Sequence, residues 1–214
     1  MAITRSDERT ADAIVHWVGL TLCPVASAIL IWSARDKSGR AIASVIIYCV
    51  GLLAMVGCSA LYHLSSNTSR KALFRRLDHA AIFLLIAGTY TPFALGPIGD
   101  RTGIGLLAFV WAVAACGIGL KLFKPVAIER VSVAMYLALG WSGLAILGRL
   151  LSALSGEALV LLATGGLLYT VGVLFHLRED VRYQEAIWHG FVLAGAACHY
   201  AAILHESLLA PTLP

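Results

Sequence analysis

Long apolar segments recur along the whole chain, and short polar stretches separate them. A helix that crosses the hydrocarbon core of a bilayer needs about 20 apolar residues. Seven segments approach or exceed that length, with boundaries good to a few residues: Ala13–Ala34, Ala41–Leu64, Leu77–Pro97, Gly103–Leu120, Val131–Leu147, Ala158–Leu177 and Ala186–Leu209. The pattern therefore predicts an all-α membrane protein with seven transmembrane helices.

The composition supports this prediction and excludes other classes. Hydrophobic residues make up 59% of the chain and charged residues only 13%, whereas soluble domains carry about 25% charged residues. A transmembrane β-barrel would need short alternating segments instead of continuous apolar ones. We therefore expect one seven-helix transmembrane domain over residues 1–214, integral to the cell membrane, with membrane lipids as its partners. No basic stripe suggests nucleic acid, and the sequence does not determine the oligomeric state.

The distribution of Lys and Arg predicts the orientation of the helices. Eleven of the 16 basic residues lie at the N-terminus or in the second, fourth and sixth loops, and five lie in the first, third and fifth loops. Basic residues are enriched in cytoplasmic loops. The N-terminus is thus predicted to be cytoplasmic, and an odd number of spans places the C-terminus outside.

Several ionisable residues converge at the cytoplasmic ends of three predicted spans. Ser59 and His63 share one face near the end of the second span, because residues four apart lie one helical turn apart. Asp78 begins the third span, and Glu185 with His189, again four apart, begins the seventh. Ionisable residues inside a membrane are costly and usually functional, so this convergence indicates a site.

Two imidazoles with one or two carboxylates form a ligand set that suits Zn²⁺ and leaves a position for water. Taken singly, each residue is also compatible with a solvated helix end, and only the convergence favours a metal. His16 and His176 also lie near inner ends and are further candidates for the third ligand. His79 is expected to be interfacial or to support Asp78. His199, ten residues beyond His189, is expected to be a hydrogen-bonded core residue.

Several motifs together resemble the haemolysin III branch of the progestin and adipoQ receptor superfamily, seven-span proteins related to adiponectin receptors. The resemblance covers essentially the whole chain. The motifs are Ser59-Ala-Leu-Tyr-His63, Leu77-Asp78-His79-Ala-Ala-Ile-Phe, Ala87-Gly-Thr-Tyr-Thr-Pro92, Gly140-Trp141, Gly165-Gly-Leu-Leu-Tyr-Thr-Val-Gly172 and Ala186-Ile-Trp-His-Gly-Phe-Val-Leu-Ala-Gly195.

The resemblance implies a zinc ion held by His63 and by two histidines spaced four apart on the seventh span. Asp78 is then expected to hold the metal-bound water, with Ser59 close by. This chain departs at one ligand, because Glu185 stands where the family pattern has the first of the two histidines. A carboxylate can replace an imidazole on zinc, so we expect His63, His189 and Glu185 as the metal ligands. Alternatively, the metal is lost or the preferred ion differs.

Three functions are compatible with these residues. The first is a ceramidase-like, zinc-dependent hydrolase of a lipid amide or ester, with Asp78 as the catalytic base and Ser59 as a hydrogen-bond donor. The second is a receptor-like or membrane-homeostasis protein in which the metal is structural. The third, suggested by the family name, is a cytolytic pore. A secreted toxin would need a soluble form, and nothing in this sequence is typical of a soluble protein, so the third function is disfavoured. Polar residues at one end only also disfavour an ion channel or a proton pump. The sequence does not decide between the first two functions.

The predicted orientation can be tested with reporter fusions. At the N-terminus, a reporter that works only in the cytoplasm should be active, and one that works only outside should be inactive. At Pro214 the reverse is expected. A cytoplasmic reporter signal from Pro214 would contradict the orientation and the common depth of the site residues.

Overall fold

The computed structural model describes residues 5–66, 69–123, 129–178 and 180–209, and all of the regular secondary structure within them is helical. Seven helical segments of this part of the chain are long and apolar enough to cross a membrane, which confirms the predicted fold class and an integral, multi-pass protein. The elements are α1 Arg5–Ser33, α2 Gly39–Leu64, α3 Lys71–Phe93, the π-helical turn η1 Ala94–Ile98, α4 Arg101–Phe123, α5 Glu129–Gly140, the 3₁₀ turn η2 Ser142–Ile146, α6 Leu147–Ala153, α7 Gly156–His176 and α8 Gln184–Leu209.

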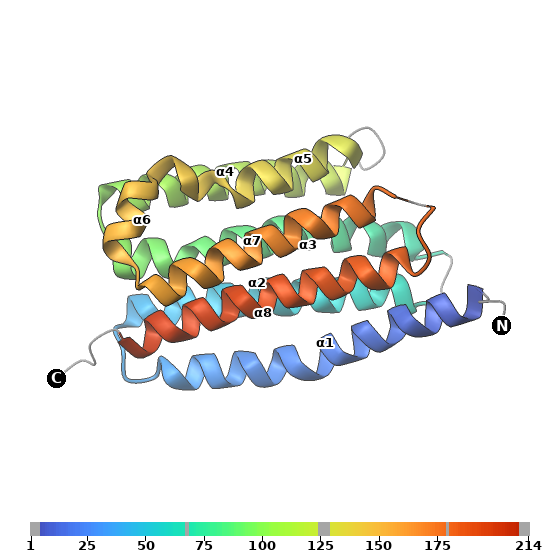
Figure 1. Ribbon diagram of the computed structural model, residues 1–214, viewed down its shortest axis with the longest axis horizontal. Helices are drawn as coiled ribbons and strands as arrows, with labels where there is room; N and C mark the ends of the chain where they lie inside the picture. The colour runs from blue at the N-terminus through green and yellow to red at the C-terminus, as the bar shows by residue number, and fades with distance from the viewer. Residues whose placement is uncertain (1–4, 67–68, 124–128, 179, 210–214) are drawn as a thin grey trace.

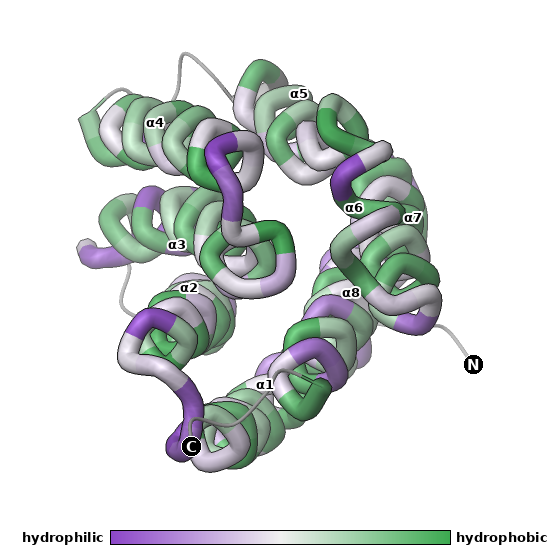
Figure 2. The backbone as a smooth tube through the Cα atoms, turned by 90° about the vertical axis from the view of Figure 1, so that its left-hand side faces the viewer, coloured by the Kyte–Doolittle hydropathy of each residue, from purple (hydrophilic) through white to green (hydrophobic). Residues whose placement is uncertain are grey.

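The long helices run alongside one another in one bundle (Figure 1). Seen along the bundle, they form a ring in the order α1, α2, α3, α4, α5, α7 and α8, and α8 closes the ring against α1 (Figure 2). α1 begins and α8 ends at opposite ends of the bundle (Figure 1), as an odd number of spans requires. Which end faces the cytoplasm stays a prediction.

The first helix extends further toward the N-terminus than the hydropathy pattern indicates. It begins at Arg5, eight residues before the predicted start at Ala13. The polar residues before Ala13 therefore continue the same helix, and Asp12 and His16 are one turn apart on it. Because of this extension, the Asp12 carboxylate lies inside the bundle, whereas the hydropathy pattern assigned it to the region before the first span.

The fifth span is interrupted, whereas the sequence predicts a continuous helix over Val131–Leu147. α5 ends at Gly140, and Trp141, at φ −90° and ψ 0°, leads into the 3₁₀ turn. The Tyr90 hydroxyl accepts a hydrogen bond from the Gly143 N–H at 2.9 Å and lies 2.7 Å from the Gly140 carbonyl oxygen, to which it donates. An unpaired backbone group is costly in a membrane, so Tyr90 supplies partners that the broken helix lacks.

Polar residues at the loops begin several helices. Ser38 and Ser155 cap α2 and α7 by accepting hydrogen bonds from backbone N–H groups. Asp100 accepts from the Gly103 N–H at 2.9 Å, which lowers the pKa of its carboxyl group, and the neighbouring Arg149 acts in the same direction. The predicted loop between Leu120 and Val131 lies partly outside the described residues, as does part of the loop between Leu64 and Leu77.

Small residues permit α2 and α3 to approach closely. A Cβ atom at Gly51 would lie 3.0 Å from the Leu84 carbonyl oxygen, and one at Gly88 would lie 3.2 Å from the Ile47 carbonyl oxygen. Both neighbours are backbone atoms, which cannot rotate away. The glycines are thus required where the two backbones pass each other.

We expect Gly51→Ala to destabilise the protein and Gly57→Ala, on the same helix, to have no such effect. The first adds a methyl group against backbone, which costs about 1–3 kcal/mol. The second meets no described atom within 4 Å and gains up to about 1 kcal/mol of helix propensity. Thermal unfolding of both variants in the same detergent checks this, and equal melting temperatures would contradict the close approach.

Candidate metal centre

Four ionisable side chains from three helices meet at one end of the bundle. Asp12 and His16 belong to α1, His63 to α2 and His189 to α8. One potential ligand atom from each residue lies within 4.8 Å of those from the other three. The three imidazole rings contact one another, with centroids 4.5–5.0 Å apart. Asp12, His16 and His189 are buried, so the group lies inside the protein.

The Asp12 carboxylate lies beside all three histidines. Its Oδ2 is 3.6 Å from Nδ1 of His16, and its contacts with the other two are shorter. Its Oδ1 lies 2.7 Å from Nδ1 of His189, and its Oδ2 lies 3.3 Å from Nδ1 of His63. An ionised carboxylate only accepts hydrogen bonds, so both Nδ1 atoms carry hydrogen. In the neutral rings, the lone pairs are then on the two Nε2 atoms.

His16 adopts the same tautomer for a different reason. Its Nδ1 lies 2.9 Å from the backbone carbonyl oxygen of Asp12, which can only accept. Its Nε2, 3.1 Å from the Ser59 hydroxyl, therefore has the lone pair of the neutral ring. One residue, Asp12, thus orients all three histidines, as carboxylates and carbonyls do for metal-binding histidines.

This donor set suits a transition metal. Neutral imidazole nitrogens are common zinc ligands. The Asp12 carboxylate holds the rings through Nδ1, which leaves Nε2 of each ring as the nitrogen that can bind a metal. Nitrogen donors with one carboxylate favour zinc and its neighbours over magnesium or calcium. The residues present therefore fit a metal ion, although the arrangement alone does not identify which one.

Ser59 connects this group to Asp78, a buried residue near the start of α3. Its hydroxyl approaches Nε2 of His16 and also hydrogen-bonds with the Asp78 carboxylate. A hydroxyl has one hydrogen, so it can donate to only one of them at a time. When the His16 lone pair has another partner, Ser59 donates to Asp78.

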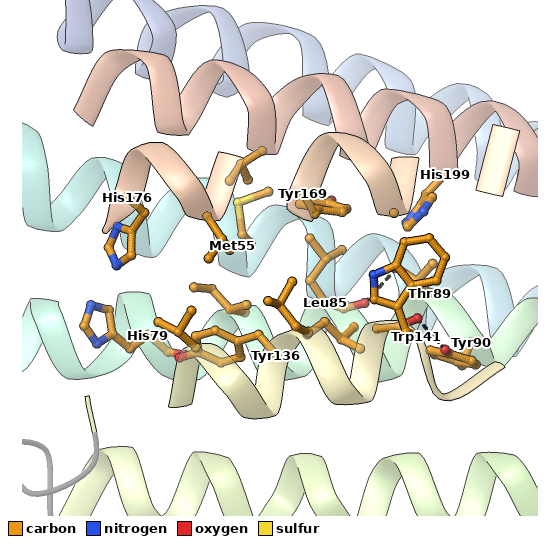
Figure 3. A pocket seen from close by; sticks show the side chains of 18 of the residues that line it. Met55, His79, Leu85, Thr89, Tyr90, Tyr136, Trp141, Tyr169, His176 and His199 are labelled. Carbon is orange, nitrogen blue, oxygen red and sulfur yellow. Dashed lines mark hydrogen bonds between the residues drawn. The ribbon is translucent and has the colours of Figure 1, made fainter. Parts of the chain in front are cut away.

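The group opens into a cavity of about 970 Å³ that is lined by residues of α2 to α8 and not by residues of α1. Ser59, His63, Asp78 and His189 line the cavity, while Asp12 and His16 lie behind them and do not. Figure 3 shows His79 and His176 at one end of the cavity, and Tyr90, Trp141 and His199 at the other. Most residues between the two ends are aliphatic or aromatic, so the cavity is an apolar chamber with polar ends.

Comparison with known proteins identifies the family. A model of the haemolysin-III-related family matches residues 5–200. The chain belongs to the haemolysin-III-related family. This finding confirms the resemblance drawn from the motifs.

Relatives of this haemolysin-III-related chain occur in bacteria and animals. It is 37% identical to the haemolysin-3 homologue of Bacillus subtilis strain 168, over 96% of the chain and 97% of the relative. It is 36% identical to haemolysin-3 of Bacillus cereus, over 92% and 90%. It is 30% identical to the human monocyte to macrophage differentiation factor, over 78% and 71%. No solved structure matches the chain significantly.

Most of the site residues predicted from the sequence lie in or beside the four-residue group of this haemolysin-III-related chain, and Glu185 differs from them. His63 and His189 belong to the four-residue group, and Ser59 and Asp78 adjoin it. Glu185 begins the same helix as His189, but its side chain is 64% exposed and its Oε2 lies 3.8 Å from Nδ1 of His63. Glu185 as a metal ligand stays a prediction.

Three other histidines considered in the sequence analysis lie in different parts of the structure. His16, a further candidate for the third ligand, lies in the group, whereas His176 lines the cavity outside it. Nε2 of His199 lies 3.3 Å from the backbone carbonyl oxygen of Leu162 on α7, which is the hydrogen bond expected of a core histidine.

The sequence analysis missed Asp12. It lies one residue before the predicted first span and therefore reads as part of a solvated terminus. One signal was present, because Asp12 and His16 have the same spacing of four as the other two polar pairs. That spacing places both on one helical face, provided that the helix begins before the apolar segment.

We expect Asp12→Ala to weaken zinc binding by about 10–100-fold, the usual effect of removing a residue that orients metal-binding histidines. Asp36→Ala, which removes an exposed carboxylate paired with Arg35, is the matched control and should bind zinc as the wild type does. Titration with a zinc indicator measures both. Normal binding by Asp12→Ala with loss in Glu185→Gln would instead assign the third ligand to Glu185.

Proposed function

We propose that this protein is a zinc-dependent hydrolase that cleaves an amide or ester bond of a membrane lipid. The observation that carries the proposal is the position of the metal-binding group at the polar end of an apolar cavity, beside a buried carboxylate that does not belong to it. The volume of about 970 Å³ lies at the upper end of the range for small-molecule sites. An acyl chain fits the apolar part of such a cavity.

His16, His63 and His189 would hold the metal through Nε2, with Asp12 orienting the rings. When bound, Zn²⁺ supplies two effects, polarisation of a carbonyl group and greater acidity of water. Asp78 lines the cavity and accepts the proton of the attacking water as a general base. Ser59 donates a hydrogen bond that orients the Asp78 carboxylate. The surrounding apolar residues exclude bulk water from the reaction.

A structural metal is the second candidate, and a specific observation favours it. The four residues connect α1, α2 and α8, and two of them, Asp12 and His16, do not line the cavity. A metal bound there would also hold three helices together. The two functions differ in what they require of Asp78, because a structural metal has no need for a base.

We expect Asp78→Asn to separate the two candidates. The substitution keeps the shape of the side chain and removes the negative charge that accepts a proton. If the site is catalytic, hydrolysis of a fluorogenic lipid amide or of the matching ester falls about 10²-fold or more. Zinc content and melting temperature should stay at the wild-type values.

Two further variants complete this test. His63→Ala should lose zinc, stability and hydrolysis together, because metal binding is coupled to folding. Asp36→Asn, which changes an exposed carboxylate at the opposite end of the bundle, should change none of them. Wild-type hydrolysis by Asp78→Asn, with loss of zinc and stability in His63→Ala, would assign the metal a structural role. Absence of a stoichiometric transition metal from the wild-type protein would refute both.

A further inference from the structure

A second polar group lines the same end of the cavity from the side of α3 and α4. It consists of Arg75, His79 and Lys121, and all three residues line the cavity. Lys121 lies in the last turn of α4, where lysine side chains ordinarily extend toward lipid head groups and water. Here the residue is only 1% exposed, so its side chain is turned into the protein.

The contact between Lys121 and His79 determines which nitrogen of the histidine ring carries hydrogen. Nζ of Lys121 lies 3.2 Å from Nδ1 of His79. An ammonium group only donates, so Nδ1 accepts and the proton of the neutral imidazole is on Nε2. The Tyr136 hydroxyl donates to the backbone carbonyl oxygen of His79 at 2.9 Å, which attaches α5 to this part of α3. Arg75, Lys121 and Nε2 of His79 are therefore all hydrogen-bond donors, and the side chains of Arg75 and Lys121 are positively charged.

The basic group complements the metal-binding group. Arg75, Asp78 and His79 lie within five consecutive residues of α3. Asp78 contacts Ser59, and His79 contacts Lys121. Adjacent helical residues point about 100° apart, so α3 directs a carboxylate toward the metal-binding group and an imidazole toward Lys121. In Figure 3, His79 and His176 face each other across this end of the cavity. The apolar chamber begins directly beyond them.

We propose that Arg75, His79 and Lys121 form a subsite for the anionic head group of a single-chain lipid whose acyl chain occupies the apolar chamber. Cationic donors bind phosphates and carboxylates strongly through charge-assisted hydrogen bonds. The assignment rests on the proposed function in one respect, since it makes the substrate an acidic lipid whose head group is held beside Asp78. Binding itself requires neither hydrolysis nor a metal.

The proposal can be tested by direct binding to the purified protein in a neutral detergent. Radiolabelled dodecyl phosphate is the anionic probe, and radiolabelled dodecanol is the neutral probe with the same chain. Lys121→Met should weaken binding of dodecyl phosphate by about tenfold or more and leave dodecanol binding unchanged. Lys121→Arg keeps the charge and should stay within about threefold of the wild type. Lys71→Met, which removes a lysine outside the cavity, is the matched control.

Competition identifies the source of the anion. Laurate that displaces dodecyl phosphate shows that the subsite also accepts carboxylate lipids, whereas failure of laurate assigns it to phosphate lipids. Displacement by inorganic phosphate at the same concentration as dodecyl phosphate would overturn a lipid head-group site.

Three other results would also overturn the proposal. Unchanged binding of dodecyl phosphate to Lys121→Met would show that the lysine does not bind the head group. Its role would then be limited to a favourable interaction with the C-terminal end of α4. Equal loss of both probes would show that the substitution disturbs the chamber instead of removing a charge. Failure of Lys121→Arg to restore binding would exclude the charge as the cause. Failure to detect hydrolysis would affect the proposed function and not this one.

Discussion

The contact of the Asp12 carboxylate with His63 and His189 is the interaction on which the arrangement of this end of the bundle depends. An ionised carboxylate inside a membrane protein is tolerated only when it is paired, and here two imidazole N–H groups from different helices pair with it. Much of the remaining surface of α1 exposes large apolar side chains, such as Ile14, Trp17 and Leu22. Lipid can solvate those side chains in any rotation of the helix. The contact of Asp12 with His63 and His189 therefore determines which face of α1 turns inward.

The same requirement explains the irregular parts of the fold. Where α5 is broken at Trp141, the Tyr90 hydroxyl pairs with the backbone groups that the helix leaves. Threonines within the spans, such as Thr89 and Thr170, donate to the carbonyl oxygen four residues earlier. Within the described residues, only the side-chain oxygens of Ser27 and Tyr48 are buried without a hydrogen-bond partner. The bundle thus satisfies nearly all of its buried polar groups internally, as a bilayer demands.

The cavity derives its chemical character from where these polar groups are placed. The end of the cavity beside Asp78 and His79 has two different sides, one with imidazoles and carboxylates and one with cationic donors, and both continue into a common apolar chamber. Such an interior matches an amphiphile with a short polar head. α3 separates the two sides because neighbouring residues on a helix, Asp78 and His79, point in different directions.

Hydropathy by itself determined the seven spans and the all-helical class, because the length of an apolar run is a local property of a helix. The family followed from the resemblance of the motifs. Hydropathy and residue spacing also indicated His63 and His189 as a pair at one depth. Only the tertiary structure decided that Asp12 and His16 join them, that Glu185 is largely exposed and that Lys121 turns inward. Those outcomes depend on where each helix begins and how it is rotated about its axis, which contacts between helices determine and hydropathy does not encode.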